Sequence, residues 1–444
     1  MELKKHYIRY TFMMSLAASA GTVQALSDEE QLGKSIFFDD NLSINDNQSC
    51  AACHAPEVGW TGPINDINAG GSVYEGSIPD RFGNRKPPSA AYATPSPVLH
   101  FVDEKANNKN KTEILFIGGN FWDGRATGEK LGNPAADQAQ GPFLNPLEQA
   151  LPDNACVVYR VCNAAYPVMF ETVFPGGCDI DFPADTDALC AAGDQVPLDP
   201  ADRDQVDQSY DLIALAIAAY EASAEVNQFS SKYDAYLAGM VDLSKEEKMG
   251  LNLFKSAGKC ANCHILDPGP VGEPPLLTDF TFDNLGVPRN PENPFYEMLG
   301  FNPDGINWTD KGLGEFLANR MDYQQYAAEN NGKQKVPTLR NVDLRPEPGF
   351  VKAYTHNGYF KTLKQIVHFY NTRDLKPVCP DDPSTQIDES LFTTVEDALA
   401  QECWPEPEVA ANVNTSELGN LHLTDAQEDA IVAFMRTLSD GYPR

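Results

Sequence analysis

Basic residues and long apolar runs are scarce in this chain of 444 residues. Lys and Arg number 33 against 64 Asp and Glu, so the formal net charge is −31. Such an acidic chain is poorly suited to binding nucleic acid or an acidic membrane surface. Beyond the N-terminus no segment approaches the length of a membrane span. The acidity is interpreted as an aid to solubility in a saline environment, with a basic or salt-adapted partner as the alternative.

Cysteine and histidine are also sparse, at ten and seven residues, yet they combine twice in one pattern. Both copies have the sequence C-x-x-C-H, and they consist of Cys50, Cys53 and His54, and of Cys260, Cys263 and His264. This is the attachment signature of haem c, in which both thiols bind the porphyrin and the His ligates the iron. A single zinc site is the alternative, but zinc ribbons keep their C-x-x-C pairs much closer in sequence. We therefore expect two covalent haem c groups.

The N-terminus indicates where these haems are attached. Lys4, Lys5 and Arg9 precede an apolar stretch over residues 10–23, and residues 23–25 form a small-x-Ala cleavage site. These features predict a secretory signal peptide over residues 1–25. The stretch is short and weakly apolar for the alternative, an uncleaved anchor. We expect the mature protein to be periplasmic or exported to the cell surface.

Six cysteines lie outside the haem motifs, an even number that predicts three disulfides in an exported protein. Proximity favours a bond between Cys379 and Cys403. The other four pair among themselves in an order that the sequence leaves open, and they are Cys156, Cys162, Cys178 and Cys190. We interpret residues 151–203 as an acidic, disulfide-stapled insertion without clear periodicity, and residues 377–407 as a smaller one.

The segments before the two haem motifs repeat each other. The matched residues are Ser27, Glu30 and Gly33 before the first motif and Ser244, Glu247 and Gly250 before the second. A Ser followed three residues later by Glu is a capping box that starts a helix. Closing helices are predicted over residues 210–226 and from Thr424. The chain is thus predicted to be mainly α, with two cytochrome c-like haem domains over residues 26–240 and 241–444 joined by long loops.

The side chain opposite each haem His decides between electron carrier and peroxidase, because a carrier fills both iron positions and a peroxidase leaves one open. After His54 no Met occurs before Met169, so the first haem lacks an obvious sixth ligand. His100 is the one His in that interval, with Tyr74 and Lys86 as weaker alternatives. Candidates for the second haem are Met298, Met321, His356, His368 and Tyr370.

Four further segments, in order along nearly the whole chain, resemble signatures of the bacterial dihaem cytochrome c peroxidases. They are F-W-D-G-R-A at 121–126, a Q-x-G-P-x-x-N-P-x-E-like stretch at 140–148, V-P-x-L-R-N-V at 336–342 and an H-D-G-x-x-x-T-L-like stretch at 356–363. The resemblance makes Glu148 the acid–base residue for peroxide cleavage. It makes Gln140 a hydrogen-bonding partner of peroxide and Trp122 an electron relay between the haems. Core packing is the alternative role for Trp122.

The same resemblance implies a calcium ion between the domains. Its carbonyl ligands correspond to Lys335 and Pro337, but the Asn ligand of the family is replaced by Lys86. A cation at that position is unfavourable for calcium.

Two departures resemble the MauG-like branch of the family. The expected stretch after the first motif has no displaceable His, and Tyr370 stands where the peroxidases place an axial Met. The resemblance therefore implies an open first haem and a second haem ligated by His264 and Tyr370. It favours an enzyme that uses hydrogen peroxide to oxidise a Trp or Tyr of a protein partner. A peroxidase fed by a small cytochrome or cupredoxin, and a non-catalytic electron-transfer protein, are the alternatives.

Overall fold

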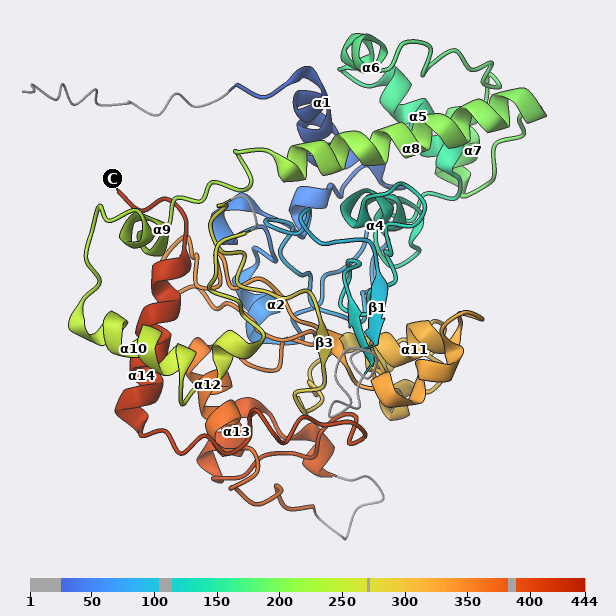
Figure 1. Cartoon of the computed structure of the whole chain (residues 1–444). Coiled ribbons are helices and arrows are strands. Elements are labelled where there is room, and N and C mark those ends of the chain that lie inside the picture. The colour runs from blue at the N-terminus through green and yellow to red at the C-terminus, as the bar shows by residue number, and fades with distance from the viewer. Residues whose placement is uncertain (1–24, 104–113, 270–271, 382–388, 444) are drawn as a thin grey trace, which may run out of the picture.

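The computed structural model describes residues 25–103, 114–269, 272–381 and 389–443 (Figure 1). As predicted, these residues are mainly helical, with short two-stranded sheets. The predicted signal peptide lies, except for its final residue, outside the described residues. None of the described helices combines the length and the apolar character needed to cross a membrane.

Two sets of elements follow each other along the chain. The first set contains α1 (Asp28–Phe37), α2 (Asn65–Ala69), β1 (His100–Asp103), β2 (Ile114–Ile117), α4 (Pro134–Leu144), α5 (Asn154–Asn163), α6 (Pro167–Val173), α7 (Thr186–Ala192) and α8 (Pro200–Ala222). The second set contains α9 (Lys232–Leu237), α10 (Lys245–Lys255), β3 (Phe282–Asp283), α11 (Leu313–Ala318), β4 (Gln334–Lys335), α12 (Leu363–Thr372), α13 (Val395–Ala400) and α14 (Asp425–Met435). β1 pairs antiparallel with β2, and β3 with β4.

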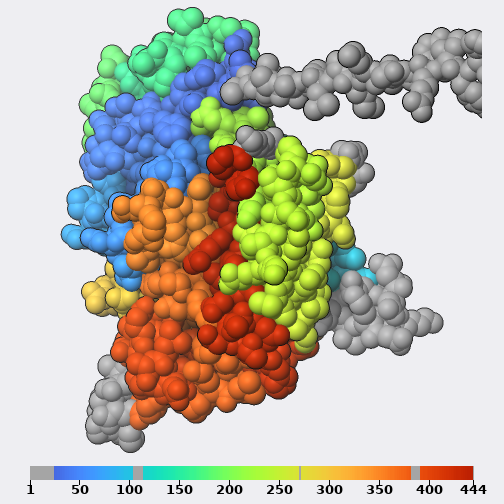
Figure 2. All heavy atoms as spheres, turned by 90° about the vertical axis from the view of Figure 1, so that its left-hand side faces the viewer, coloured from blue at the N-terminus to red at the C-terminus, as the bar shows by residue number. Residues whose placement is uncertain are grey.

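Each set contains the same helix pair. α1 packs on α8 in the first, and α10 packs on α14 in the second; Figure 2 shows α14 in red beside the yellow-green segment that carries α10. Both predicted capping boxes are present at the starts of α1 and α10. A Cβ on Gly33 would lie 1.8 Å from the carbonyl oxygen of Ala216, and a Cβ on Gly250 would lie 1.8 Å from that of Ala430. The matched glycines therefore allow both pairs of helices to cross closely.

Two hydrophobic cores surround these helix pairs. The first draws its buried residues from positions 32–226, and the second from positions 233–438. We call the elements around these cores the first module and the second module. The exact domain boundary at residue 240 stays a prediction.

The first insertion is more regular than predicted. It contains α5, α6 and α7, and α8 begins at Pro200 rather than at Tyr210. Asp199 caps α8 by accepting hydrogen bonds from the backbone N–H groups of Ala201 and Asp202, and Pro200 suits a first helical position. The structure also resolves the open pairing as Cys156–Cys190 and Cys162–Cys178, and it confirms Cys379–Cys403.

Candidate functional site

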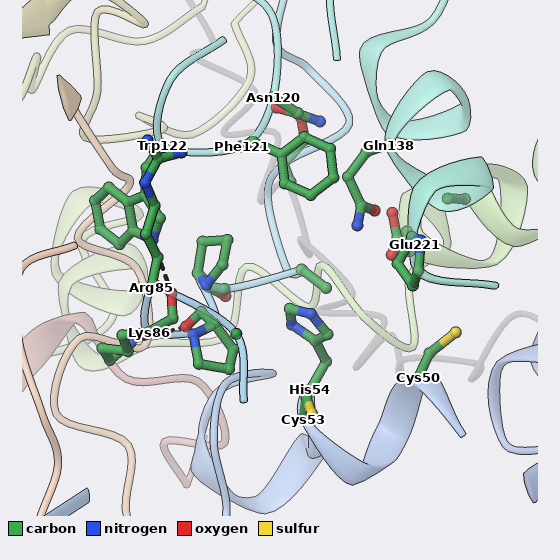
Figure 3. A pocket seen from close by; sticks show the side chains of 18 of the residues that line it. Cys50, Cys53, His54, Arg85, Lys86, Asn120, Phe121, Trp122, Gln138 and Glu221 are labelled. Carbon is green, nitrogen blue, oxygen red and sulfur yellow. Dashed lines mark hydrogen bonds between the residues drawn. The ribbon is translucent and has the colours of Figure 1, made fainter. Parts of the chain in front are cut away.

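The first haem motif forms one wall of a cavity in the first module. Residues Cys50–Ala52 form a 3₁₀ turn, and the backbone N–H of His54 donates to the carbonyl of Cys50 at 3.0 Å. This turn brings both thiols and the imidazole to the same cavity (Figure 3). Nδ1 of His54 lies 3.2 Å from the carbonyl oxygen of Trp60, so Nε2 is available to a metal. Burial lowers the pKa of His54 to about 4, which keeps the ring neutral as a ligand must be.

The second motif repeats this arrangement in the second module. Residues Cys260–Asn262 form the 3₁₀ turn, and the N–H of His264 donates to the carbonyl of Cys260 at 2.9 Å. Nδ1 of His264 lies 2.9 Å from the carbonyl oxygen of Leu277. Each cavity thus presents two thiols and one free imidazole nitrogen, which fits the donor set of haem c. Because the two motifs line separate cavities, the alternative of a shared zinc site is wrong.

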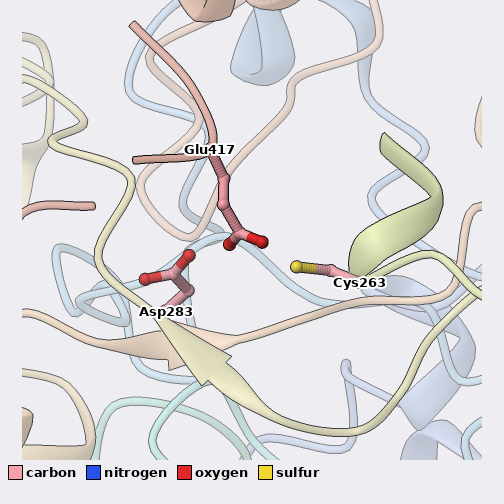
Figure 4. A group of neighbouring side chains, drawn as sticks. All are labelled: Cys263, Asp283 and Glu417. Atoms are coloured by element: carbon pink, nitrogen blue, oxygen red, sulfur yellow. The ribbon is translucent and has the colours of Figure 1, made fainter. Parts of the chain in front are cut away.

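Two carboxylates lie beside one of these thiols. Oxygen atoms of Asp283 and Glu417 lie within 4.8 Å of the sulfur of Cys263 and of each other (Figure 4). The Nδ2 group of Asn414 donates to both carboxylates, at 2.6 and 2.9 Å. Because Cys263 belongs to the haem motif, this cluster is part of the second haem site rather than a separate metal site.

Glu148 lines the first cavity, at the turn that follows α4. The Nδ2 group of Asn145 donates to its carboxylate at 3.0 Å. Burial raises the pKa of Glu148, and the Arg125 charge and the Asn145 bond oppose that rise only in part. A carboxyl group whose pKa lies above its usual range is more readily protonated, which suits a residue that must both accept and give a proton.

The structure brings Gln138, and not Gln140, to this cavity. The amide of Gln140 points elsewhere: its Nε2 group donates to Asp211 at 2.6 Å, and its oxygen accepts from Lys130 at 2.9 Å. Positions two residues apart on a helix differ by about 200° in direction, so both amides cannot face one cavity. In Figure 3 the amide of Gln138 points toward the ring of His54.

Trp122 lies between the two cavities and lines both of them. Its indole N–H donates to the carbonyl of Lys86 at 2.8 Å, and its own carbonyl accepts from the N–H of Lys335 at 2.8 Å. Only 8% of the residue is exposed. The backbone preceding it is held by Phe121 at a positive φ of 62°, a conformation that bulky residues rarely adopt. Trp122 is therefore held rigidly between the two cavities.

The candidate sixth ligands separate into near and distant groups. Tyr370, from α12, and His356 line the second cavity. Met321 is 90% exposed, and the sulfur of Met298 accepts from the N–H of Phe82 instead. Nδ1 of His368 faces Glu428 at 3.0 Å, outside the cavity lining. The structure therefore narrows five candidates to two.

At the first cavity the candidate His is absent from the lining. His100 is exposed on β1, where Nδ1 lies 2.8 Å from the carbonyl of Val98. Tyr74 and Lys86 do line the cavity, but their polar groups already bind protein. The hydroxyl of Tyr74 accepts from the N–H of Ile64 at 2.8 Å, for example. Among the described residues that line this cavity, His54 is the one His and no Met occurs.

Glu221, on α8, lines the first cavity and was missed by the sequence analysis. It is 4% exposed, and burial raises its pKa to about 8. The sequence nevertheless indicates that this residue is buried. One face of the helix carries Ile213, Ile217 and Glu221 at a spacing of four. A carboxyl group in such a stripe faces the core.

Comparison with known proteins assigns the family. The family model of di-haem cytochrome c peroxidases matches residues 27–242. Methylamine utilization protein MauG of Paracoccus denitrificans is 33% identical over 432 residues, which cover 96% of this chain and 93% of MauG. Cytochrome c551 peroxidase of Nitrosomonas europaea is 26% identical over 347 residues, with coverages of 77% and 72%. The crystal structure of the diheme peroxidase BthA from Burkholderia thailandensis matches with a TM-score of 0.68 and 27% identity, with coverages of 95% and 88%.

This similarity extends over both modules. The two C-x-x-C-H motifs, their matching cavities and the MauG alignment over nearly the whole chain agree with one another. The chain therefore belongs to the di-haem cytochrome c peroxidase family and is a haem-dependent peroxidase or oxidoreductase.

Proposed function

We propose that this protein is an exported dihaem enzyme that uses hydrogen peroxide at the first haem to oxidise a Trp or Tyr of a protein partner. The unlike linings of its two cavities support this proposal. Glu148 and Gln138 face the first cavity, which offers no spare His or Met among its described lining residues. Tyr370 faces the second. An electron carrier would instead supply two protein ligands to each iron.

When bound, the two haems supply an iron that accepts peroxide and a path for electrons. The protein supplies the proton transfers. Glu148 removes a proton from one peroxide oxygen and returns it to the other, which then leaves as water. The amide of Gln138 orients the peroxide by a hydrogen bond. Overall, peroxide takes up two electrons and two protons and becomes two waters, and the partner side chain gives up both electrons and both protons.

Trp122 lies between the site of peroxide reduction and the second haem site. Its ring borders both cavities, and its hydrogen bonds to Lys86 and Lys335 hold it in place. A rigid aromatic ring between two redox centres needs little rearrangement when its charge changes. With both haems bound, Trp122 would supply the path for electrons between the second site and the first.

Ligation of the second iron by Tyr370 would favour a protein substrate over a small redox protein as the source of electrons. Burial raises the pKa of its phenol, so the phenolate forms only beside a compensating positive charge such as that of a ligated iron. An anionic oxygen ligand lowers the reduction potential of haem iron. A small cytochrome or cupredoxin would then be a poor reductant. The similarity to a cytochrome c551 peroxidase keeps a detoxifying peroxidase, with His356 as the ligand in place of Tyr370, as the second candidate.

The test begins with electron paramagnetic resonance of the ferric holoprotein. We expect one high-spin and one low-spin haem, whereas two low-spin haems would point to the electron carrier. Peroxide is then added together with proteins encoded in the same operon, and mass spectrometry follows modification of partner Trp and Tyr. Tyr370→Met should abolish the modification and speed turnover with reduced cytochrome, and Glu148→Gln should slow both reactions by about 10²-fold. Rapid cytochrome oxidation by the unmodified enzyme, without partner modification, would favour the detoxifying peroxidase.

A further inference from the structure

Lys86 occupies the junction between the two cavities. It lines both of them. Its carbonyl accepts from the indole N–H of Trp122 at 2.8 Å, and its N–H donates to the carbonyl of His356 at 2.8 Å. A charge on the Lys86 side chain is therefore close to both haem sites.

The ammonium group of Lys86 is enclosed by protein. The residue is 8% exposed, and its Nζ donates to the hydroxyl of Thr61 and to the carbonyl of Pro87, both at 2.9 Å. Burial lowers the pKa of Lys86 to about 8, so the group is mostly charged at neutral pH. Two of its three N–H groups have these acceptors.

Two more buried lysine amines lie at the same junction, and burial lowers the pKa of both, that of Lys335 to about 7. Nζ of Lys352 donates to the carbonyls of Val58, Asn341 and Leu344 at 2.8, 2.6 and 3.2 Å. Nζ of Lys335 donates to the hydroxyl of Ser96 at 2.7 Å and to the carbonyl of Gly119. Both residues line the second cavity.

This arrangement does not fit the calcium ion that the family resemblance implies. Calcium takes six to eight oxygen ligands and prefers carboxylates and free carbonyls. At this junction the carbonyl oxygens of Pro87, Gly119 and Asn341 already accept hydrogen bonds from lysine Nζ groups. The family's Asn ligand is replaced by Lys86, whose positive charge repels a second cation.

We propose that the ammonium group of Lys86 is the resident cation between the two haems, in place of calcium, and that its charge raises the reduction potentials of both. A fixed positive charge stabilises the reduced haem, because the oxidised iron carries one more positive charge. The protein then needs no divalent metal to keep its haems coupled. Lys86 acts as a positioning and potential-setting residue, because it holds Trp122 through its carbonyl and supplies charge through its side chain.

Metal analysis of the full-length holoprotein tests the first half of the proposal. Protein purified without chelators is measured by inductively coupled plasma mass spectrometry, and resonance spectra are recorded before and after EGTA treatment. We expect no stoichiometric calcium and unchanged spectra. One calcium per chain, or spectra that change on its removal, would overturn the proposal even if no Lys86 variant folds.

Redox titration of Lys86→Met tests the second half, with Lys361→Met as the matched control. Lys361 is also 8% exposed, and its Nζ donates to the carbonyl of Gly358 at 2.8 Å and to the hydroxyl of Ser72 at 3.1 Å, but it lines neither cavity. Lys86→Met should lower the midpoint potentials of both haems, and Lys361→Met should lower neither. Equal potentials in both variants and the unmodified protein would overturn the assignment. Neither measurement uses a partner protein or turnover, so the result is independent of the proposed function.

Discussion

The two modules use one scaffold for two different haem environments. A Cβ added to Gly33 or to Gly250 would meet a carbonyl oxygen of the closing helix at the same distance of 1.8 Å, that of Ala216 on α8 or of Ala430 on α14. The side chain four residues beyond each carbonyl, Tyr220 or Phe434, packs on the same glycine in both modules. Equal contacts at equal spacings show that the helix pair is a repeated unit that positions the haem motif.

The next position on each closing helix shows where the modules diverge. Glu221 lines the first cavity, and Met435 lines the second at the corresponding place. Glu148 and Gln138 face the first cavity, while Tyr370 faces the second. The modules thus share what holds a haem and differ in the polar groups that surround it. The chemistry of each site is decided by a few side chains on a common frame.

The largest loss of stability should come from forcing apart the helix pair that both modules share. Gly33→Ala and Gly250→Ala each place a methyl group 1.8 Å from a backbone carbonyl oxygen, which cannot move without separating the helices. We expect each variant to lose about 3 kcal/mol or more of stability. Resonance spectra should show damage to the high-spin haem in the first variant and to the low-spin haem in the second. Gly349→Ala is the control, because a Cβ there meets nothing within 4 Å.

Glu148→Gln tests whether a carboxyl group of the first cavity, unlike one of the second, takes part in the reaction with peroxide. The change is nearly isosteric, so both haems and the fold should be retained. The peroxide-dependent change in the haem spectrum, followed by stopped flow, should slow by about 10²-fold because acid–base assistance is lost. Glu408→Gln alters a carboxyl group that lines the second cavity and serves as the control. An unchanged rate in Glu148→Gln would remove this residue from the proton path.

Glu221 gives the first module a pH dependence that Met435 cannot give the second. Burial raises the pKa of Glu221 to about 8, so the folded chain keeps a proton that the unfolded chain has already lost. The contribution of protonated Glu221 to the free energy of unfolding is present at low pH and is lost as the pH rises from about 5 through 8. The stability of Glu221→Met relative to the unmodified protein should therefore rise with pH, by about 3.5 kcal/mol between pH 5 and 8. Denaturant unfolding of the holoprotein at several pH values measures this, and a constant difference would contradict it.

The smallest expected effect distinguishes the side-chain amide of Gln138 from that of Gln140. Gln138→Ala should slow the reaction with peroxide by about tenfold, the scale of one lost hydrogen bond. Gln140→Ala should leave that rate unchanged, since its amide binds Lys130 and Asp211 outside the cavity. The same stopped-flow experiment measures both. The reverse result would restore Gln140 as the residue that binds peroxide.

Features that depend on short stretches of chain were predictable from the sequence. Each haem motif needs only five consecutive residues, and each capping box needs four. The structure confirms both capping boxes and the bond between Cys379 and Cys403. Local hydrogen bonding and short loops fix such features, so neighbouring residues carry the information.

Features that depend on direction or on distant segments were decided by the tertiary structure. The choice between Gln138 and Gln140 depends on the rotation of α4 about its axis. The exclusion of His100 and Met321 depends on strands and loops that carry them to the surface. The junction at Lys86 is assembled from residues near positions 60, 120 and 356. Packing brings these segments together, and no local pattern records which side chains will then share a cavity.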